Sequence, residues 1–351
     1  MKLLQKLFIL ALIPCLLLGT VCCTKRDTVL KAALESKHEL RFDSEGNFKV
    51  MILADLHLQA SGLPDGMREA IKTLVDRENP NLIIFTGDNI ADAAINSDEI
   101  MQATIREAVS YIEEKKIPWI HVFGNHDAEH GYTKEQQQAV YESFEYCISK
   151  HGDEELTGVG NYVIPIYGVD DTVKFAIWGL DSGAYLSAEE KSALFPTEST
   201  FAGYPHAIYD YIHRDQIEWY ADISKRLQAA NDGVPVPGLM AFHIPLQESY
   251  TAWVNREGLP HTGEKNEGVA ASSYNSGLFD VLRSRDDVKA VVNGHEHVND
   301  FMVEYGGIKL CYSSTISTNT YHNAEMFGSR VFVINEQAPS DIQTYMSYLN
   351  K

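Results

Sequence analysis

The sequence predicts an α/β protein built from alternating strands and helices. Two observations carry this prediction: short apolar runs alternate with stretches of helical periodicity, and several of the apolar runs end in polar clusters. Apolar runs without a polar face are typical of strands buried on both sides, as in βαβ units. With 351 residues, 44% of them hydrophobic, the chain is long enough to bury a large core.

In the first half of the chain, the alternation is regular. Three apolar runs are predicted as strands, at residues 48–54, 81–86 and 118–123. Two helices are predicted between them, at residues 67–77 and 100–115, because apolar residues recur there at helical spacing.

The second half repeats the pattern less regularly. Helices are predicted at residues 215–229 and 276–284, and strands at 163–167, 174–180, 238–242, 288–292, 300–305, 309–312, 330–334 and 343–348. Residues 183–210 and 246–272 are polar and contain Gly or Pro, so we expect loops there, the second lying over the site.

The N-terminus has the layout of an export signal. Lys2 and Lys6 precede an apolar run at residues 7–18, which has the length of a signal-peptide core and is short for a membrane span. Cys22 or Cys23 at the end of the run resembles the lipidated cysteine of a bacterial lipoprotein signal. We therefore expect a lipid anchor at one of these cysteines, with simple secretion and an uncleaved anchor as alternatives.

The predicted organisation has three parts. Residues 1–23 are expected to be a signal peptide, residues 24–45 a polar tether, and residues 46–351 a single domain. Export would place this domain in the periplasm or at the cell surface. Outside the export segment, Cys147 and Cys311 remain, and the sequence does not decide whether they pair.

The charge balance argues against several partners. The formal net charge is -20, from 49 acidic and 29 basic residues. Such a surface repels nucleic acid and anionic lipid, so we expect no nucleic-acid binding face. A phosphate ligand stays compatible with this charge if metal ions supply local positive charge. The sequence does not indicate an oligomeric state.

Five predicted strands end in polar clusters. In chain order, the clusters are Asp55-Leu56-His57, Gly87-Asp88-Asn89, Gly124-Asn125-His126-Asp127, His243, and Gly294-His295-Glu296-His297. Ligand sites of open α/β sheets gather beyond the carboxyl ends of the strands, so these clusters are expected to converge. Gly87, Gly124 and Gly294 are each expected to allow a sharp turn before a functional residue.

The residue types of these clusters predict a metal centre. Oxygen and nitrogen donors together suit Mn, Fe or Zn, and the set is too rich in histidine for Ca or Mg. More candidate ligands are present than one tetrahedral ion needs, which predicts two divalent transition-metal ions sharing a carboxylate. Asp88 is the predicted bridge, because it lies between the other candidates in chain order.

The ordered set of D-x-H, G-D-x, G-N-H-D, H and G-H-x-H resembles the calcineurin-like metallophosphoesterase superfamily. The resemblance covers residues from about 48 to 298. Residues 241–246 and 294–301 are similar to a narrower branch of small plant and fungal phosphatases related to purple acid phosphatases. The resemblance implies a four-layer fold of two packed, mixed β-sheets flanked by helices.

The resemblance also implies a role for each matching residue. It assigns the first ion to Asp55, His57, Asp88 and His297, and the second ion to Asp88, Asn125, His243 and His295. His126 is expected to contact the phosphate and to protonate the leaving oxygen, with Asp127 orienting its ring.

One departure from the purple enzymes bears on the metal centre. Those enzymes carry a tyrosine ligand three residues after the bridging aspartate, where this chain has Ala91, and they lack a histidine at the position of His57. The colour of a tyrosinate–iron centre is therefore not expected.

These residues predict hydrolysis of a phosphate ester by a hydroxide that two metal ions activate. A phosphomonoesterase is favoured. The alternatives are a phosphodiesterase using the same site, and a metal-binding surface lipoprotein without catalysis. His126 and Asp127 argue against the second alternative, because a binding protein needs no general acid. The sequence identifies neither the substrate nor the metals.

Overall fold

The computed structural model describes residues 28–195 and 209–351. The predicted signal peptide, residues 1–23, lies outside the described residues, as do Cys22 and Cys23. Within the described part, no helix combines the length and the apolar character that a bilayer crossing requires.

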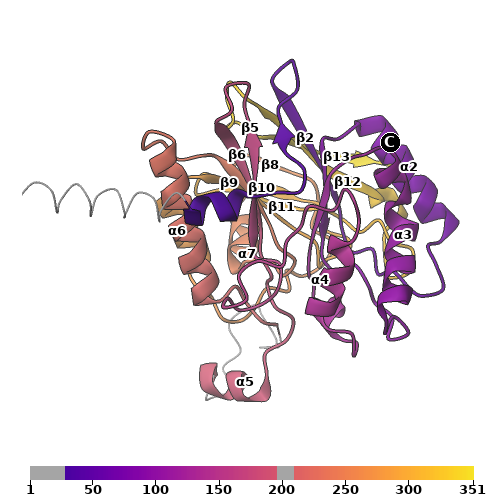
Figure 1. Ribbon diagram of the computed structural model, residues 1–351. Coiled ribbons are helices and arrows are strands. Elements are labelled where there is room, and N and C mark those ends of the chain that lie inside the picture. The colour runs from indigo at the N-terminus through magenta and orange to yellow at the C-terminus, as the bar shows by residue number, and fades with distance from the viewer. Residues whose placement is uncertain (1–27, 196–208) are drawn as a thin grey trace, which may run out of the picture.

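Two mixed β-sheets form the centre of the molecule (Figure 1). The eight-stranded sheet has the order β1 (Leu40–Arg41), β5 (Tyr162–Tyr167), β6 (Val173–Gly179), β7 (Gly238–Ala241), β9 (Val288–Asn293), β11 (Ile308–Tyr312), β10 (Met302–Tyr305) and β8 (His261–Thr262). The five-stranded sheet has the order β13 (Gln343–Tyr348), β12 (Gly328–Asn335), β2 (Asn47–Leu53), β3 (Leu82–Thr86) and β4 (Trp119–Val122).

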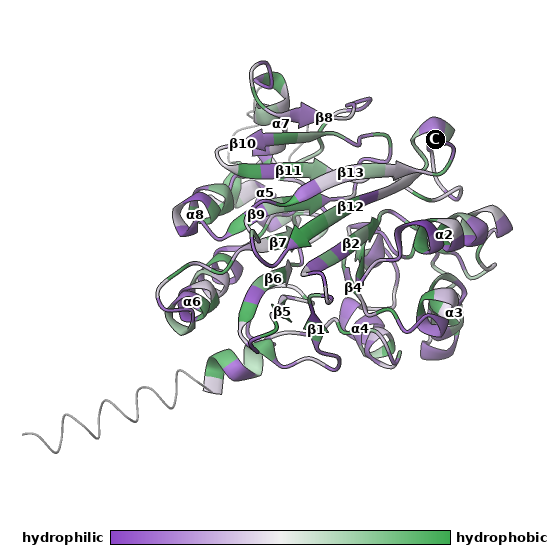
Figure 2. Ribbon diagram, turned by 90° about the horizontal axis from the view of Figure 1, so that it is seen from above, coloured by the Kyte–Doolittle hydropathy of each residue, from purple (hydrophilic) through white to green (hydrophobic). Residues whose placement is uncertain are grey.

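Helices cover the outer face of each sheet, which gives four layers (Figure 2). The five-stranded sheet is covered by α2 (Asp65–Glu78), α3 (Asp98–Glu114) and α4 (Lys134–Glu142). The eight-stranded sheet is covered by α6 (Arg214–Ala230), α7 (Gln247–Val254) and α8 (Leu278–Arg285). The short helix α5 (Ala188–Leu194) projects from the bottom of the molecule in Figure 1. The predicted four-layer arrangement is confirmed.

The alternation of side chains along β2 explains why residues 50–53 are all apolar. Val50 and Ile52 point into the core between the two sheets. Met51 and Leu53 point to the opposite face and pack in the core under α2 and α3. Successive strand residues face opposite sides of a sheet, so a strand covered on both sides has no polar face.

The predicted strands and long helices are present with ends within a few residues of the predicted ones, but two predicted loop regions differ. Residues 246–272, expected to be a loop, contain α7 and β8. Residues 183–210 contain α5. The helix α4 was not predicted, because its sequence has three consecutive glutamines and few apolar residues; a capping box between Thr133 and Gln136 marks its start.

Part of the predicted tether is folded onto the domain. Residues 28–34 are helical, and β1 pairs in parallel with β5. Leu40 and Phe42 are buried in the core between the sheets, where Phe42 packs against Phe48. The prediction of a polar tether over residues 24–45 is therefore wrong for residues 28–45, because these apolar side chains have a core to enter.

Cys147 and Cys311 are free and buried. Cys147 packs in the core beneath α3 and α4, whereas Cys311 lies in the core between the sheets. The question of pairing that the sequence left open is answered: each cysteine acts as a small apolar side chain in its own core.

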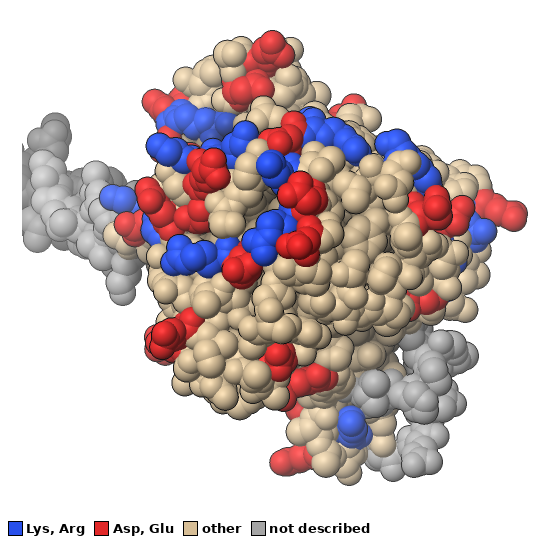
Figure 3. All heavy atoms as spheres, turned by 90° about the vertical axis from the view of Figure 1, so that its right-hand side faces the viewer, with Lys and Arg blue, Asp and Glu red and all other residues tan. Residues whose placement is uncertain are grey.

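Charges of both signs share the face formed by α2 and α3 (Figure 3). Arg68 pairs with Glu107 at 2.6 Å, and Lys115 pairs with Asp76 at 3.4 Å. Exposed pairs of this kind contribute about 0–1 kcal/mol each to stability. This face therefore presents mixed charge rather than a field of one sign.

Phe42 offers a direct test of whether residues 28–45 belong to the folded domain. Replacing it with Ala should lower the free energy of unfolding by about 3–5 kcal/mol, because a buried aromatic ring is removed from a packed core. Chemical denaturation measures this change. The exposed neighbour Lys31→Ala is the control, and equal stability of the two variants would contradict the burial of this segment.

Candidate metal centre

The candidate ligands follow strands of both sheets. Asp55, Asp88 and Asn125 come two or three residues after the ends of β2, β3 and β4, which are parallel neighbours in the five-stranded sheet. His243 and His295 come after β7 and β9, which are parallel neighbours in the eight-stranded sheet. The carboxyl ends of these five strands meet at one place, so residues distant in the chain become neighbours.

A first group of ligands consists of four buried residues whose donor atoms lie within 4.8 Å of one another: Asp55, His57, Asp88 and His297. The Nε2 atoms of His57 and His297 are 3.2 Å apart. His297 Nε2 lies 3.7 Å from Asp55 Oδ1, and His57 Nε2 lies 3.7 Å from Asp88 Oδ2. The group offers two carboxylate oxygens and two imidazole nitrogens, which suits a divalent transition metal.

A second group contains Asp88, His243 and His295, also within 4.8 Å. His243 Nε2 lies 3.1 Å from Asp88 Oδ2 and 3.1 Å from His295 Nδ1. Asn125, which follows β4, has a buried Oδ1 that accepts no hydrogen bond from any described residue. A buried oxygen without a donor is costly, and a cation would satisfy it. The residues therefore fit the two metal ions that the sequence predicts.

Asp88 belongs to both groups. Its Oδ1 accepts a hydrogen bond from the backbone N–H of His126 at 2.8 Å, which fixes the carboxylate. Its Oδ2 faces both His57 and His243. One oxygen thus lies between the two sets of donors, the geometry of a bridging ligand; the bridging role itself stays a prediction.

Backbone carbonyls set the tautomers of two histidines. His243 donates from Nδ1 to the carbonyl oxygen of Thr86 at 2.8 Å, and His297 donates from Nδ1 to that of Tyr321 at 3.1 Å. With Nδ1 donating to a carbonyl, Nε2 is the nitrogen that points at the carboxylates, and in the neutral ring it carries the free lone pair. Such partners orient histidine ligands and raise their basicity.

The backbone is strained at four candidate ligands. Asp55, His57, Asp88 and His295 have φ values of 53°, 45°, 48° and 78°. This left-handed region disfavours residues with a Cβ, and it is tolerated where surrounding structure enforces it, as at functional sites.

Glycine is needed for different reasons at the three positions that precede the ligands. Gly87 has a φ of 91°, as expected for a sharp turn, and a Cβ there would meet His243 Nδ1 at 2.5 Å. Gly124 and Gly294 have ordinary φ, so the expected turn is not their reason. Instead, a Cβ on Gly124 would lie 2.2 Å from Asp88 Oδ1, and one on Gly294 would lie 2.7 Å from Asp55 Oδ2. These glycines make room for the carboxylates.

Burial controls the protonation of the group. It raises the pKa of Asp55 to about 8 and lowers the pKa values of His57, His295 and His297 to about 3, 3 and 4. Burial would also lower the pKa of His243, but the nearby Asp88 and Asp55 carboxylates raise it to about 9. Three of the four histidines are therefore neutral at pH 7, the form that binds metal.

His126 lies at the edge of the centre, where 37% of its side chain is exposed. Its Nε2 is 4.0 Å from Asp88 Oδ2, and its ring centroid is 5.0 Å from that of His57. Its Nδ1 donates to Glu129 Oε2 at 2.6 Å. The ring therefore turns one nitrogen toward the metal ligands and holds the other on a carboxylate.

The role expected for Asp127 is wrong in this structure. Asp127 is fully buried, and its carboxylate accepts backbone N–H groups from Asn89, Ile90 and Gly124 at 2.8–3.1 Å. It ties the loop after β4 to the loop after β3. Asp127 thereby positions the backbone of the ligands, and Glu129 is the residue that orients the ring of His126.

Glu129 was missed by the sequence reasoning, although a signal exists. His126–Ala128 form a short 3₁₀ helix capped by Glu129. Residues three apart eclipse each other in such a helix, so a carboxylate at this spacing from a histidine can bond to its ring.

Three tyrosines also surround the centre without having been assigned a role. The ring of Tyr321 stacks on His297 at 4.2 Å, and Tyr209 meets His295 edge-on at 4.6 Å. Tyr185 donates its hydroxyl to Glu129 and stacks on Tyr209. The loops that carry them are far from the ligands in the chain, and no short motif marks them.

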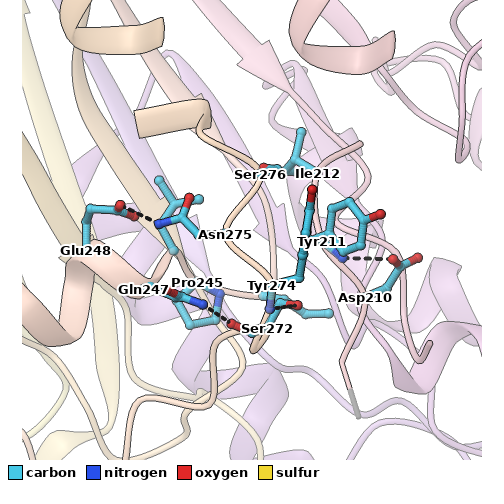
Figure 4. Close-up of a pocket in the computed structure, with 12 residues that line it drawn as sticks. Asp210, Tyr211, Ile212, Pro245, Gln247, Glu248, Ser272, Tyr274, Asn275 and Ser276 are labelled. Atoms are coloured by element: carbon cyan, nitrogen blue, oxygen red, sulfur yellow. Dashed lines mark hydrogen bonds between the residues drawn. The ribbon is translucent and has the colours of Figure 1, made fainter. Parts of the chain in front are cut away.

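A small cavity lies between residues 210–212, residues 244–248 at the start of α7, and residues 272–276 (Figure 4). The rings of Tyr211 and Tyr274 contact each other at its wall, with centroids 4.6 Å apart. Its volume is about 20 Å³, room for about one water molecule and too small for an organic phosphate. An organic phosphate substrate therefore does not bind in this cavity.

Comparison with known proteins agrees with this geometry. The model of the calcineurin-like phosphoesterase family matches residues 48–299. The chain belongs to the calcineurin-like phosphoesterase family. Proteins of this family are metal-dependent phosphoesterases, and the two ligand groups fit that class of hydrolase.

Individual relatives confirm the narrower resemblance. "Probable inactive purple acid phosphatase 29" of Arabidopsis thaliana is 30% identical over 323 residues, which cover 83% of this chain and 77% of the plant protein. "Phosphatase DCR2" of Saccharomyces cerevisiae is 31% identical over 308 residues, 78% of this chain and 48% of the yeast protein. A dimetal phosphatase of Danio rerio has a similar fold, with a TM-score of 0.51 and 13% identity over 85% of this chain and 98% of that one.

Metal binding by this phosphoesterase should release protons. In the metal-free protein at pH 7, Asp55 and His243 each hold a proton, because their pKa values of about 8 and 9 lie above the pH. Both must lose it to bind metal, so about two protons should be released from these side chains at pH 7, and fewer as the pH rises through 9. Calorimetric titration of metal-stripped protein with Zn²⁺ in buffers of different ionisation enthalpy measures this number. A heat that does not depend on the buffer would contradict the proton assignment.

Proposed function

We propose that this chain hydrolyses phosphate esters, with phosphomonoesters favoured, at a centre of two divalent transition-metal ions such as Mn, Fe or Zn. The observation that carries the proposal is the pair of ligand groups that share Asp88, with His126 beside them. A binding site for metal alone would not need a partly exposed histidine held with one nitrogen toward the centre.

The chemistry divides between the ions and the chain. When bound, the two ions supply an activated water and neutralise the charge that develops on the phosphate. The chain holds the ligands on rigid strand ends and excludes water from the buried side. His126 contributes a proton for the leaving oxygen from Nε2, a step that adds about 10²–10⁴-fold to the rate in enzymes.

The names of the relatives do not agree on activity. The yeast relative is named a phosphatase, whereas three plant relatives are named probable inactive purple acid phosphatases. The complete set of candidate ligands in this chain, together with His126, favours catalysis over the alternative of a metal-binding surface lipoprotein. That alternative predicts bound metal without turnover.

A phosphodiesterase using the same site is the second candidate. His57 belongs to the first ligand group and is compatible with cleavage of diesters as well as monoesters. Parallel assays with p-nitrophenyl phosphate and bis-p-nitrophenyl phosphate on metal-reconstituted protein distinguish the two. Faster hydrolysis of the diester would overturn the preference for monoesters.

Removal of the shared ligand tests the proposed function. Asp88→Ala should lower hydrolysis of both substrates by about 10³-fold and reduce the bound metal, because one carboxylate serves both ligand groups. Turnover and elemental analysis are measured on the same samples. Asp76→Ala, on the surface of α2, is the control. Full activity in Asp88→Ala would refute the proposal.

We also propose that the protein is exported to the periplasm or the cell surface and lipid-anchored at Cys22 or Cys23. The support is the charge and length of the N-terminal apolar run and its terminal cysteines. Metabolic labelling with a fatty acid should mark the full chain and fail in the double variant Cys22→Ser/Cys23→Ser. Labelling that persists in the double variant would contradict anchoring at this pair.

A further inference from the structure

Three hydrogen bonds join the candidate general acid to a candidate metal ligand. His126 Nδ1 donates to Glu129 Oε2 at 2.6 Å. Tyr185 donates its hydroxyl to Glu129 Oε1 at 2.7 Å. Asn125 donates from Nδ2 to the Tyr185 oxygen at 2.9 Å. The Glu129 carboxylate thus receives one bond on each oxygen, and the Tyr185 hydroxyl both donates and accepts.

The direction of these bonds fixes two orientations. A carboxylate can only accept, so His126 must carry a proton on Nδ1, which leaves Nε2 to face the metal ligands. The Asn125 amide gives its nitrogen to Tyr185, so its oxygen faces away from that hydroxyl. That oxygen is the buried Oδ1 that has no partner among the described residues.

The chain of bonds also connects the two halves of the fold. Asn125, His126 and Glu129 lie after β4 of the five-stranded sheet. Tyr185 lies after β6 of the eight-stranded sheet, where its backbone pairs with Tyr209 and its ring stacks on that of Tyr209 at 5.6 Å. Tyr209 in turn contacts the candidate ligand His295. The position of Tyr185 is therefore fixed by contacts with Tyr209, on the side of the centre that the eight-stranded sheet forms.

We propose that Glu129 and Tyr185 are positioning residues: Glu129 aims His126 at the leaving oxygen, and Tyr185 aims the carbonyl of Asn125 at the second metal ion. The inference rests on the phosphoesterase function proposed above. Neither residue is expected to touch substrate or metal. Each acts through the side chain that it holds.

The first half of the proposal makes a prediction about leaving groups. A general acid matters most when the departing oxygen is strongly basic, because such an oxygen leaves poorly without a proton. Phenyl phosphate has a more basic leaving group than p-nitrophenyl phosphate. If His126 is no longer oriented toward the leaving oxygen, hydrolysis of phenyl phosphate should slow more than hydrolysis of p-nitrophenyl phosphate. General damage to the site would slow both reactions equally.

The variant Glu129→Gln keeps the size of the side chain and removes the charge. We expect kcat for phenyl phosphate to fall about 10–100-fold, the usual effect of losing an orienting partner, and kcat for p-nitrophenyl phosphate to fall by less than about threefold. Glu107→Gln is the matched control, because Glu107 is also a half-exposed carboxylate, and it pairs with the side chain of Arg68. Equal losses on both substrates would overturn the positioning role.

A double variant separates action through His126 from an independent effect. His126→Ala alone should show the same selective loss on phenyl phosphate, and adding Glu129→Gln should lower the rate no further, because residues that act as a unit are not additive. If the fall in rate of the double variant equals the product of the falls in the two single variants, Glu129 acts independently of His126. That result would overturn this half of the proposal.

The second half is tested without any assay of activity. Tyr185→Phe removes the acceptor of the Asn125 amide, and we expect about 10–100-fold weaker binding of one ion, with the other unchanged. Zn²⁺ content after dialysis against graded chelator measures both affinities. Tyr345→Phe is the matched control, since Tyr345 and Tyr185 are each 41% exposed and each donates to a glutamate. Two ions bound with wild-type affinity in Tyr185→Phe would overturn the assignment.

The two experiments distinguish the failure of this inference from the failure of the proposed function. A wild-type protein that binds two ions and hydrolyses no phosphate ester would refute the function, and the Zn²⁺ measurement on Tyr185→Phe would still decide the metal half. A wild-type protein that is active, with a Glu129→Gln variant that loses both substrates equally, would refute the positioning role alone.

Discussion

The arrangement of the centre depends on two carboxyl groups that are buried side by side. Asp55 and Asp88 lie at the ends of adjacent strands and are inaccessible to solvent. Burying such charges without compensation is strongly unfavourable. The surrounding structure answers with backbone N–H donors, from His295 to Asp55 and from His126 to Asp88, and with a shell of histidines. Divalent cations bound at this centre would complete the compensation.

The position of the centre depends on how the two sheets pack. Three candidate ligands follow strands of one sheet and two follow strands of the other. Residues such as Val50 and Leu239 fill the core between the sheets and fix their separation. Because ligands on strand ends inherit the rigidity of the sheet, the donor atoms can be held within a few ångströms without a disulfide or a flexible loop. The hydrogen bonds from Asn125 to Tyr185 and from Tyr185 to Glu129 are a second link between the same two sheets.

Much of the fold could be predicted from local patterns, and the exceptions have physical reasons. The strands were predictable because burial on both faces leaves an apolar run, as in residues 50–53 of β2. The helix α4 was not, because its buried face includes Gln137 and Gln138, which form hydrogen bonds in place of apolar contacts. β1 was missed because two apolar residues, Leu40 and Phe42, are too few to signal a strand.

The candidate site divides in the same way. The ligands were predictable as a set because each lies beside a strand end in a short motif. Tyr185 was not, because a hydrogen bond between side chains 56 residues apart leaves no trace in local sequence. Glu129 was missed although its spacing of three residues from His126 is a local signal. The error over Asp127 has a similar cause: adjacency to His126 suggested contact with the ring, whereas the chain turns its carboxylate toward three backbone amides.

At four candidate ligands, the left-handed backbone favours glycine, whereas metal binding needs a side chain. At such positions a residue with a Cβ is disfavoured relative to glycine by about 1 kcal/mol. Exchanging Asp55 or His295 for glycine would relax the backbone but would also remove a buried side chain that packs in the centre. The candidate ligands are therefore residue types that the local backbone alone would not favour.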